Sequence, residues 1–308
     1  MKRNLACNTD FAESTGDPEL ALRPLAEAGF THLHWCHHWN DDFLYTKPEI
    51  DHIRGLLKKY GLKLLDVHGS QGWEKCWNST VEHQRKAGVE IVANRIDMLR
   101  ELGGSGAVMM HVPFYSVRPD QQDEEARARV KAGFDALCRS LDELMPLLDR
   151  EDAIIAVENM WDDDWSTIEA LLDRYPENRL GLCYDSGHAN ASTNKRMDSL
   201  ERNKSRLQAL HLHDNDGSGD QHQPPFFGTI DWARLAKIIA TSSYTREISF
   251  EIAMHSTPFF VPDLPRGRPQ PYETRLAFAR DAHERCSRFV QMVETSGQGC
   301  LKGCFVVN

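Results

Sequence analysis

Short apolar runs alternate with longer amphipathic stretches along almost the whole chain. Eight mostly apolar runs of four to eight residues have the length and composition of buried strands. They cover residues 5–8, 32–36, 62–68, 106–111, 153–159, 180–185, 207–214 and 247–252. The spacing of these runs leaves room for one helix after each of them.

The intervening stretches repeat apolar residues every three or four positions, which is typical of helices that bury one face. They cover residues 18–29, 48–61, 81–104, 124–149, 165–175, 231–242 and 272–294, with the weakest pattern at 193–203. Pro18 and Pro48 suit helix starts, while Gly29 and Gly61 suit helix ends. Eight strand–helix units predict an α/β fold, a single (β/α)8 TIM barrel. No linker or repeat divides the chain, so we expect one domain over residues 1–308, with 294–308 as a C-terminal tail.

Composition agrees with a large buried core and adds a charge constraint. The 308 residues are 41% hydrophobic and 27% charged, and 36 basic against 46 acidic residues give a net charge of −10. This balance offers no basic footprint for nucleic acid. No apolar run is long enough for a membrane span, and no secretion signal follows the first residues. The scattered cysteines, eight in number, suit free thiols, so we expect a cytoplasmic protein.

Ionisable residues stand at the ends of the predicted strands from the third to the eighth. In a TIM barrel these ends meet at one mouth, where active sites form. A single histidine there is commonly structural and a single carboxylate is commonly a helix cap, but the ordered set is harder to explain in that way. The set comprises His68, His111, Glu158, Asp185 with His188, His211 with His213, Asp220 and His222 in the following loop, and Glu251.

Three of these residues are carboxylates that directly follow apolar runs, namely Glu158, Asp185 and Glu251. Buried carboxylates need partners, and converging carboxylates repel one another unless a cation keeps them ionised. The pattern therefore predicts a divalent metal ion at the barrel mouth.

The segments IAVEN, CYDSGH, LHLHDND with DQH, and SFEI together resemble the xylose isomerase-like barrel superfamily. That superfamily includes sugar isomerases and epimerases, inosose dehydratases and apurinic endonucleases of the endonuclease IV type. The resemblance implies a metal ion held by Glu158, Asp185, His211 and Glu251. Three carboxylates and one imidazole favour Mn²⁺ or Mg²⁺, with Co²⁺ or Zn²⁺ as alternatives.

The endonuclease branch offers a second interpretation of the same residues. There, three zinc ions would be held by His68 and His111 with Glu158, by the four residues above, and by His188, Asp220 and His222. Sugar-acting relatives use such histidines around a single ion to contact substrate hydroxyls. Asp41, Asp42 and the run 162–164 would give the mouth an acidic rim, which opposes a polyanion. The sequence also has DSGH in place of the endonuclease-like DTCH, so we favour a sugar over DNA.

Aromatic residues in the predicted loops suit a neutral polyhydroxylated ligand, because sugar faces pack on aromatic rings. Loop aromatics include Trp39, Trp73, Trp77, Phe114 and Trp165. We expect substrate contacts from His68, His111, His188, His213, Asp220, His222, Trp35, His37 and Trp161. The alternative is that the rings close the barrel top or form an interface between copies, and a homo-oligomer stays open.

The resemblance implies proton abstraction next to a carbonyl of a sugar or cyclitol, through an enediolate. Glu158 and Glu251 would move the proton and His188 would orient a substrate oxygen. Reprotonation gives an isomerase or epimerase, whereas loss of a β-substituent gives a lyase of the inosose dehydratase or keto-glycoside type. The residues are also compatible with a three-zinc endonuclease and with a non-catalytic sugar-binding barrel. The segment 256–273 would serve as a lid or an interface.

Overall fold

The structure is a computed structural model of the chain. It describes residues 3–12, 16–112, 123–161, 165–192, 197–265 and 268–303. Of the residues singled out in the sequence, Phe114 and the run 162–164 lie outside these ranges.

Eight parallel strands form one sheet in the order β7-β6-β5-β4-β3-β2-β1-β8. The sequence predicted every one of them, with ends that differ by a few residues. They are β1 (Leu5–Asn8), β2 (His32–Trp35), β3 (Lys63–His68), β4 (Val108–His111), β5 (Ile155–Glu158), β6 (Leu180–Asp185), β7 (Leu207–His211) and β8 (Ile248–Phe250).

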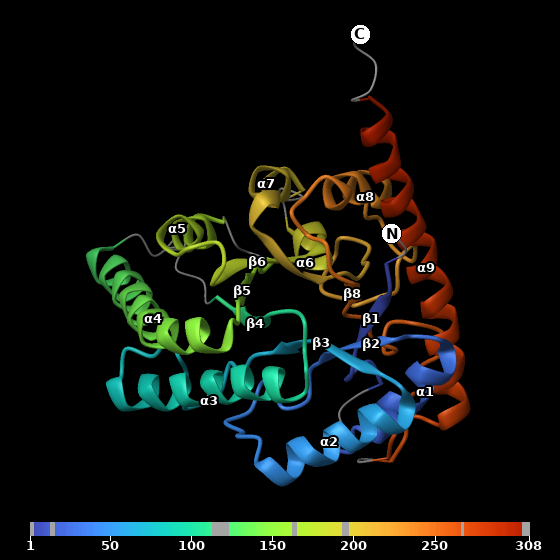
Figure 1. Ribbon diagram of the computed structural model, residues 1–308, viewed down its shortest axis with the longest axis horizontal. Helices are drawn as coiled ribbons and strands as arrows, with labels where there is room; N and C mark the ends of the chain where they lie inside the picture. Colours follow the sequence, from blue (N-terminus) through green and yellow to red (C-terminus); the bar gives the residue numbers. More distant parts are fainter. Residues whose placement is uncertain are drawn as a thin grey trace.

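The sheet closes on itself between β7 and β8. Leu212, directly after β7, forms a parallel bridge with Phe250. The Leu212 N–H donates to Ser249 O at 3.2 Å, and the Glu251 N–H donates to Leu212 O at 3.2 Å. The predicted single (β/α)8 TIM barrel is therefore confirmed (Figure 1).

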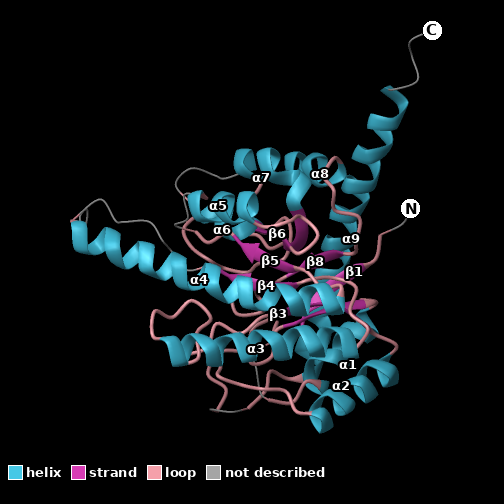
Figure 2. Cartoon of the chain, turned by 60° about the vertical axis from the view of Figure 1, so that its left-hand side comes forward, coloured by secondary structure: helices cyan, strands magenta, loops and turns pink. Residues whose placement is uncertain are grey.

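Helices surround this barrel on its outside, as the cyan layer around the magenta strands in Figure 2 shows. They are α1 (Glu19–Ala28), α2 (Lys47–Tyr60), α3 (Glu82–Glu101), α4 (Glu124–Glu151), α5 (Ser166–Arg174), α6 (Ser186–Ala191), α7 (Met197–Asn203), α8 (Trp232–Ala240) and α9 (Tyr272–Gly303), with a 3-10 turn at Lys204–Arg206. Gly29 and Gly61 end α1 and α2 with φ of 106° and 66°, a backbone conformation that glycine adopts without strain.

Two helical regions differ from the sequence expectation. Of the weak helix expected at 193–203, the described part is helical as α7, and residues 193–196 lie outside the described ranges, whereas the short α6 directly after β6 was not expected. The long α9 runs along α1 and α8 and continues to Gly303, so it includes the start of the expected tail (Figure 1). Among the residues that the structure describes, no helix has the length and apolar character needed to cross a membrane.

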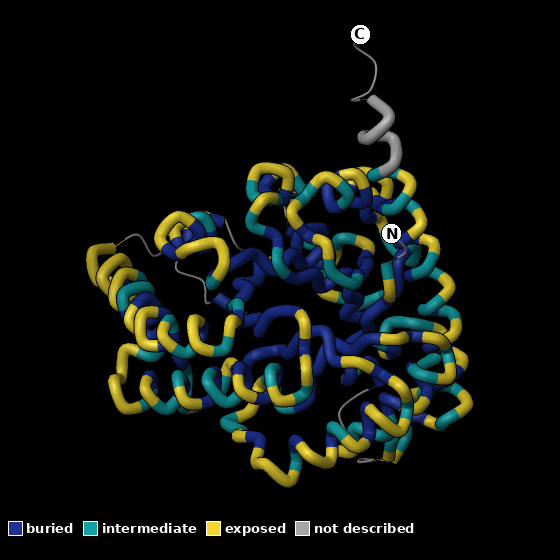
Figure 3. Tube along the Cα trace, in the orientation of Figure 1, coloured by how far each residue is buried: buried dark blue, intermediate teal, exposed yellow. Residues whose placement is uncertain are grey.

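The core lies between the strands and the apolar helix faces, so burial is concentrated on the strands (Figure 3). A second, small cluster comprises Ala107, Met109, Ala156, Cys183 and Ala209. Small side chains predominate in it. The cysteines whose side chains the structure describes are free, as the sequence predicted, and they are Cys7, Cys36, Cys76, Cys138, Cys183 and Cys286.

Gly88 on α3 offers a test of this packing. A Cβ atom at Gly88 would lie 2.3 Å from the backbone nitrogen of Trp77, whereas at the exposed Gly55 on α2 it would meet nothing within 4 Å. We expect Gly88→Ala to lower the free energy of unfolding by about 1–3 kcal/mol through overpacking. The matched Gly55→Ala change should raise it by about 0.5–1 kcal/mol through helix propensity. Denaturant unfolding measures both, and equal effects would contradict the packing argument.

Candidate functional site

The strand ends bring the predicted ionisable residues to one mouth of the barrel. His68, His111, Glu158, Asp185 and His211 are the last residues of β3 to β7, and Glu251 follows β8 directly. Side chains alternate along a strand, so a single register fixes which residues face the barrel interior. His111 pairs with Glu158 across β4 and β5, and Asp185 pairs with His211 across β6 and β7.

The central group consists of Glu158, Asp185, His211 and Glu251. One ligand atom from each residue lies within 4.8 Å of those of the other three, and all four side chains are buried. His211 Nδ1 lies 3.0 Å from Glu158 Oε1 and 2.9 Å from Glu251 Oε2. His211 Nε2 is buried and has no hydrogen-bond partner among the described residues. Four donor atoms this close together could hold one metal ion.

Opposite charges hold the two glutamates of this group in their ionised form. Burial raises the pKa of Glu158, but His211 and His111 outweigh burial and bring that pKa well below its usual value. Burial likewise raises the pKa of Glu251, which His211 and His222 bring well below its usual value. A divalent cation would also stabilise the ionised carboxylates, and no protonated imidazole would then be needed.

A second group joins this one through Glu158. His68, His111 and Glu158 each place a ligand atom within 4.8 Å of the other two. His111 Nε2 lies 3.1 Å from Glu158 Oε2, and its Nδ1 pairs with Gln71 Oε1 at 2.9 Å. His68 Nδ1 pairs with Gly69 O at 2.8 Å, which leaves Nε2 free to face the mouth.

A third group lies on the side of β6 and β7 and comprises His188, His213, Asp220 and His222. Asp220 Oδ2 lies 3.3 Å from His188 Nε2 and 3.0 Å from His222 Nε2. The His213 and His222 rings stack at a centroid distance of 4.1 Å. Burial lowers the pKa of His222, but the hydrogen bond to Asp220 and the field of Glu251 raise it to about 9. All of the ionisable residues predicted for the mouth therefore belong to one of three adjoining groups.

Asn159 supports the site, and sequence reasoning did not single it out. Its side chain accepts a hydrogen bond from the Asp185 N–H at 2.9 Å and donates one to Asp185 O at 2.9 Å. Its own carbonyl oxygen lies 2.9 Å from His188 Nδ1. Asn159 thereby links the ends of β5 and β6. Its position directly after Glu158 was the one sequence feature that pointed to Asn159. No sequence pattern reveals hydrogen bonds between neighbouring strands.

Gly187 explains the glycine of the DSGH segment. A Cβ atom there would lie 1.8 Å from the imidazole of His213. Ser186 holds the His213 backbone close to the start of α6. Its Oγ donates a hydrogen bond to His213 O at 2.7 Å and accepts one from the His213 N–H at 3.0 Å. His213 Nε2 then reaches Asp185 at 3.0 Å.

Trp35 does not join the mouth residues. It follows the interior-facing His34 on β2, so its ring points outward into the core and is only 1% exposed. Its Nε1–H donates to Tyr45 Oη at 2.8 Å. We therefore remove Trp35 from the expected substrate contacts, because the alternation of β2 turns it away from the barrel interior.

The other two expected loop contacts lie in different surroundings. His37 is buried, with its ring 5.1 Å from that of Trp35, and burial lowers its pKa to about 4. Trp161 is 41% exposed and its ring lies 5.4 Å from that of His188. Trp161 therefore adjoins the third group, whereas His37 packs beside Trp35.

The two described aspartates of the expected acidic rim lie in different surroundings, and the run 162–164 lies outside the described residues. Asp41 is exposed and pairs with His38 at 3.0 Å. The carboxylate of Asp42 accepts hydrogen bonds from the backbone N–H groups of Trp73, Glu74 and Lys75. Asp42 is thus a loop anchor rather than a free charge at the mouth.

The loop tryptophans lie in three different surroundings, at the mouth, in the core and at the surface. Trp39 lies over the mouth histidines, with ring centroids 4.7 Å from His68 and 5.2 Å from His111. Trp77 and Trp165 are buried in the core, while Trp73 is 80% exposed. Trp39 is the described loop tryptophan that contacts the second group.

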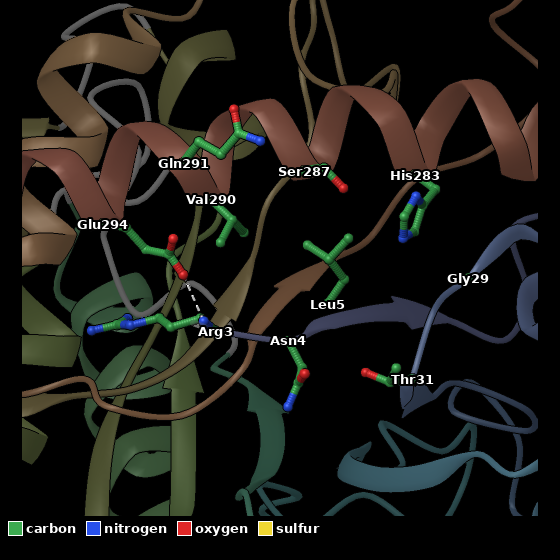
Figure 4. Close-up of a pocket in the computed structure, with 10 residues that line it drawn as sticks. All are labelled: Arg3, Asn4, Leu5, Gly29, Thr31, His283, Ser287, Val290, Gln291 and Glu294. Carbon is green, nitrogen blue, oxygen red and sulfur yellow. Dashed lines mark hydrogen bonds between the residues drawn. The ribbon is translucent and has the colours of Figure 1, made fainter. Parts of the chain in front are cut away.

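One cavity lies at the opposite end of the barrel, where the strands begin. It has a volume of about 230 Å³ and lies between the start of β1, the residues before β2 and the inner face of α9. Arg3, His283 and Glu294 line it, and the Arg3 N–H donates to Glu294 Oε1 at 2.7 Å (Figure 4). In TIM barrels this end contributes stability rather than catalysis.

Comparison with known proteins places the chain in one family. A family model described as xylose isomerase-like TIM barrel matches residues 22–282. The chain belongs to the xylose isomerase-like TIM-barrel family. An uncharacterized protein of Sinorhizobium fredii, y4fM, is 32% identical in an alignment of 258 positions that covers 76% of this chain and 80% of that protein.

Solved structures similar to this xylose isomerase-like barrel include two whose names refer to sugar epimerases. A D-tagatose 3-epimerase-like protein has a TM-score of 0.69 at 19% identity, covering 95% of this chain and 98% of that one. An L-ribulose 3-epimerase has a TM-score of 0.70 at 14% identity, covering 100% of both chains. At these identities the likeness establishes the shared fold.

Asn159 provides a test of how this xylose isomerase-like barrel holds its mouth together. Asn159→Ala removes two buried hydrogen bonds to Asp185 and leaves backbone groups unpaired. We expect the free energy of unfolding to fall by about 2–4 kcal/mol. Asn178→Ala, at an exposed asparagine, should change it by less than about 0.5 kcal/mol. Urea denaturation of both variants checks this, and similar values for the two would remove Asn159 from the supporting structure.

Proposed function

We propose that the protein is a divalent metal-dependent isomerase or epimerase of a sugar or cyclitol, which acts by proton abstraction next to a carbonyl. The observation that carries this proposal is the group of Glu158, Asp185, His211 and Glu251, which is buried at the mouth with its donor atoms converging. Membership of the xylose isomerase-like family and the epimerase names of similar structures support the same reaction class.

The residues present fit a divalent ion. Three carboxylates and one imidazole offer mostly hard oxygen donors, which suit Mn²⁺ or Mg²⁺, and the partnerless His211 Nε2 is typical of a site that receives a further group. When bound, such an ion supplies a Lewis acid that polarises the carbonyl next to the reacting carbon. We assign Glu158, Asp185, His211 and Glu251 as the residues that would hold it.

Glu158 and Glu251 are the groups proposed to move the proton. Each carboxylate approaches the same imidazole nitrogen of His211, at 3.0 and 2.9 Å, so the two border one space at the mouth. Both are ionised, which is the protonation state that a general base requires. One glutamate removes the proton and the other returns it, which inverts or relocates the carbon–hydrogen bond.

The third group would orient the substrate. Burial lowers the pKa of His188, but Asp185, Asp220 and Glu158 outweigh burial and raise it to about 10. Because His188 Nδ1 is paired with Asn159 O, a charged His188 would donate to a substrate oxygen from Nε2, and His213, Asp220 and His222 add donors and acceptors beside it. Together with His68, His111 and the exposed face of Trp161, these groups suit a small polyhydroxylated ligand better than an apolar one.

The same residues serve an elimination equally well. If a leaving group is lost from the carbon next to the enediolate, the enzyme is a lyase rather than an isomerase. An isomerase returns a proton and keeps the leaving group, whereas a lyase releases it. The identity of the product therefore shows which reaction takes place.

Two substitutions test the proton-transfer roles. Glu158→Gln and Glu251→Gln preserve size and remove the base, so we expect each to lower the rate of proton exchange by about 10²–10⁴-fold. The measurement is deuterium incorporation, followed by NMR, with ketoses, inososes and keto-glycosides in deuterium oxide containing Mn²⁺.

Glu247→Gln is the matched control. Glu247 lies just before β8, at the other end of the strand from Glu251, where it pairs with His32 at 3.4 Å. This variant should retain the wild-type exchange rate. If no substrate of the panel exchanges a proton in the wild type, the proposal is wrong, and the non-catalytic sugar-binding barrel and the endonuclease are the alternatives.

Metal removal gives an independent prediction. Dialysis against a chelator should abolish exchange, and Mn²⁺ should restore it. Because an ion that binds only the folded state at 100 times its Kd adds about 2.7 kcal/mol, Mn²⁺ should also raise the melting temperature. Asp185→Asn should remove most of that thermal shift. Full activity after thorough metal removal would contradict the proposal.

A three-zinc endonuclease is the second candidate, favoured by one observation. The three adjoining groups contain every ligand that the endonuclease branch implies, including His68, His111, Asp220 and His222. This activity would appear as nicking of a duplex that contains an abasic site. We rank it second because the net charge of −10 opposes a polyanion.

A further inference from the structure

A fourth donor group lies on the β2 side of the barrel interior, and the proposed function uses only one of its three residues, Glu251. A ring nitrogen of His34, Sγ of Cys36 and a carboxylate oxygen of Glu251 lie within 4.8 Å of one another. His34 is on β2, Cys36 follows it directly after the strand, and Glu251 follows β8. The three residues are 0%, 1% and 8% exposed. We propose that His34, Cys36 and Glu251 form a second site, with a thiolate ligand, for a softer divalent ion such as Zn²⁺.

His34 is oriented as metal-binding histidines usually are. Its Nδ1 lies 2.8 Å from Oδ1 of Asp66 on β3, and Asp66 is itself only 1% exposed. Its Nε2 is buried with no hydrogen-bond partner in the described part of the chain. A ligating imidazole commonly donates one ring N–H to a carboxylate and offers the other nitrogen to the ion. Asp66 therefore leaves Nε2 as the available donor atom.

The surroundings of Cys36 favour a cation. Cys36 is 1% exposed, and its Sγ lies within 4.8 Å of a carboxylate oxygen of Glu251 and a ring nitrogen of His34. The sulfur has only a weak contact, 3.8 Å from His34 O. Binding of a divalent ion would form the metal–sulfur bond and release the thiol proton to solvent, as at other thiolate sites.

The proposed site of His34, Cys36 and Glu251 differs in metal preference from the central group of Glu158, Asp185, His211 and Glu251. Imidazole, thiolate and carboxylate favour Zn²⁺ or Co²⁺, because soft thiolates select against Mg²⁺ and Mn²⁺. The carboxylate-rich group around Asp185 has the opposite preference. Glu251 belongs to both groups, so its two oxygens could serve one ion each.

Because both proposed metal sites include Glu251, an ion in one site should affect the activity of the other; this expectation rests on the proposed function. An ion in the second site withdraws Glu251 from proton transfer, so Zn²⁺ in excess should lower turnover of the manganese enzyme. Loss of the thiol should relieve that inhibition.

Cobalt titration of the chelator-treated protein tests the site without any activity assay. We expect two Co²⁺ ions per chain and a sulfur-to-cobalt charge-transfer absorption in the near ultraviolet. Cys36→Ser should abolish this absorption and reduce the stoichiometry to one. Cys138→Ser, at a buried cysteine on α4 that belongs to none of the donor groups among the described residues, should leave both unchanged.

Cys183→Ser removes a competing explanation, because Cys183 lies near Glu158 and His211 in the barrel interior. This variant should retain the charge-transfer absorption. No such absorption in the wild type overturns the second site. So does an absorption that persists in Cys36→Ser or disappears in Cys183→Ser.

Asp66→Asn keeps the test decisive if Cys36→Ser fails to fold. It leaves all three donor residues in place but removes the carboxylate that orients His34. We expect about 10–100-fold weaker Co²⁺ binding, read at the charge-transfer band, with Mn²⁺ binding unchanged. An unchanged Co²⁺ affinity overturns the proposal. Because no substrate is involved, failure here is distinguishable from failure of the proposed isomerase activity.

Discussion

Repulsion between buried carboxylates is the constraint on which the mouth of this barrel depends. Glu158 and Asp185 are fully buried and Glu251 almost so, with ligand atoms within 4.8 Å of one another. Two such charges about 4 Å apart interact by about 4 kcal/mol even at an effective dielectric constant of about 20. Protonated imidazoles or a metal ion must offset this repulsion. The concentration of histidines around the carboxylates follows from the same requirement.

The backbone supports this arrangement through cross-strand bonds. Asn159 ties the end of β5 to Asp185, and Ser186 ties the start of α6 to His213. Gly187 lets the His213 ring approach more closely than any side chain would permit. These contacts hold the ligand atoms in place before any ion or substrate binds, which reduces the reorganisation that binding would otherwise require.

The two ends of the barrel carry different chemistry. Where the strands begin, Arg206 donates to Tyr175 O and Leu180 O, and Arg246 donates to Ser105 O and Gln208 O. These arginines satisfy backbone carbonyl groups, which is a structural use of charge. Where the strands end, histidines and carboxylates face one another instead. This separation lets one end maintain the fold while the other retains a crowded group of ionisable side chains.

The sequence by itself determined the barrel fold and the strand ends at which the ionisable residues lie. Apolar runs and amphipathic stretches identify strands and helices because burial imposes their periodicities, and residues at strand ends such as Glu158 and His211 must then meet at one mouth. Only the tertiary structure decided contacts that depend on register and loop path. Trp35 turns outward by strand alternation, Asp42 anchors a loop more than thirty positions along the chain, and His34 meets both Asp66 and the neighbourhood of Glu251. Such pairs are distant in sequence, and neither composition nor periodicity specifies which side chains a closed barrel will bring together.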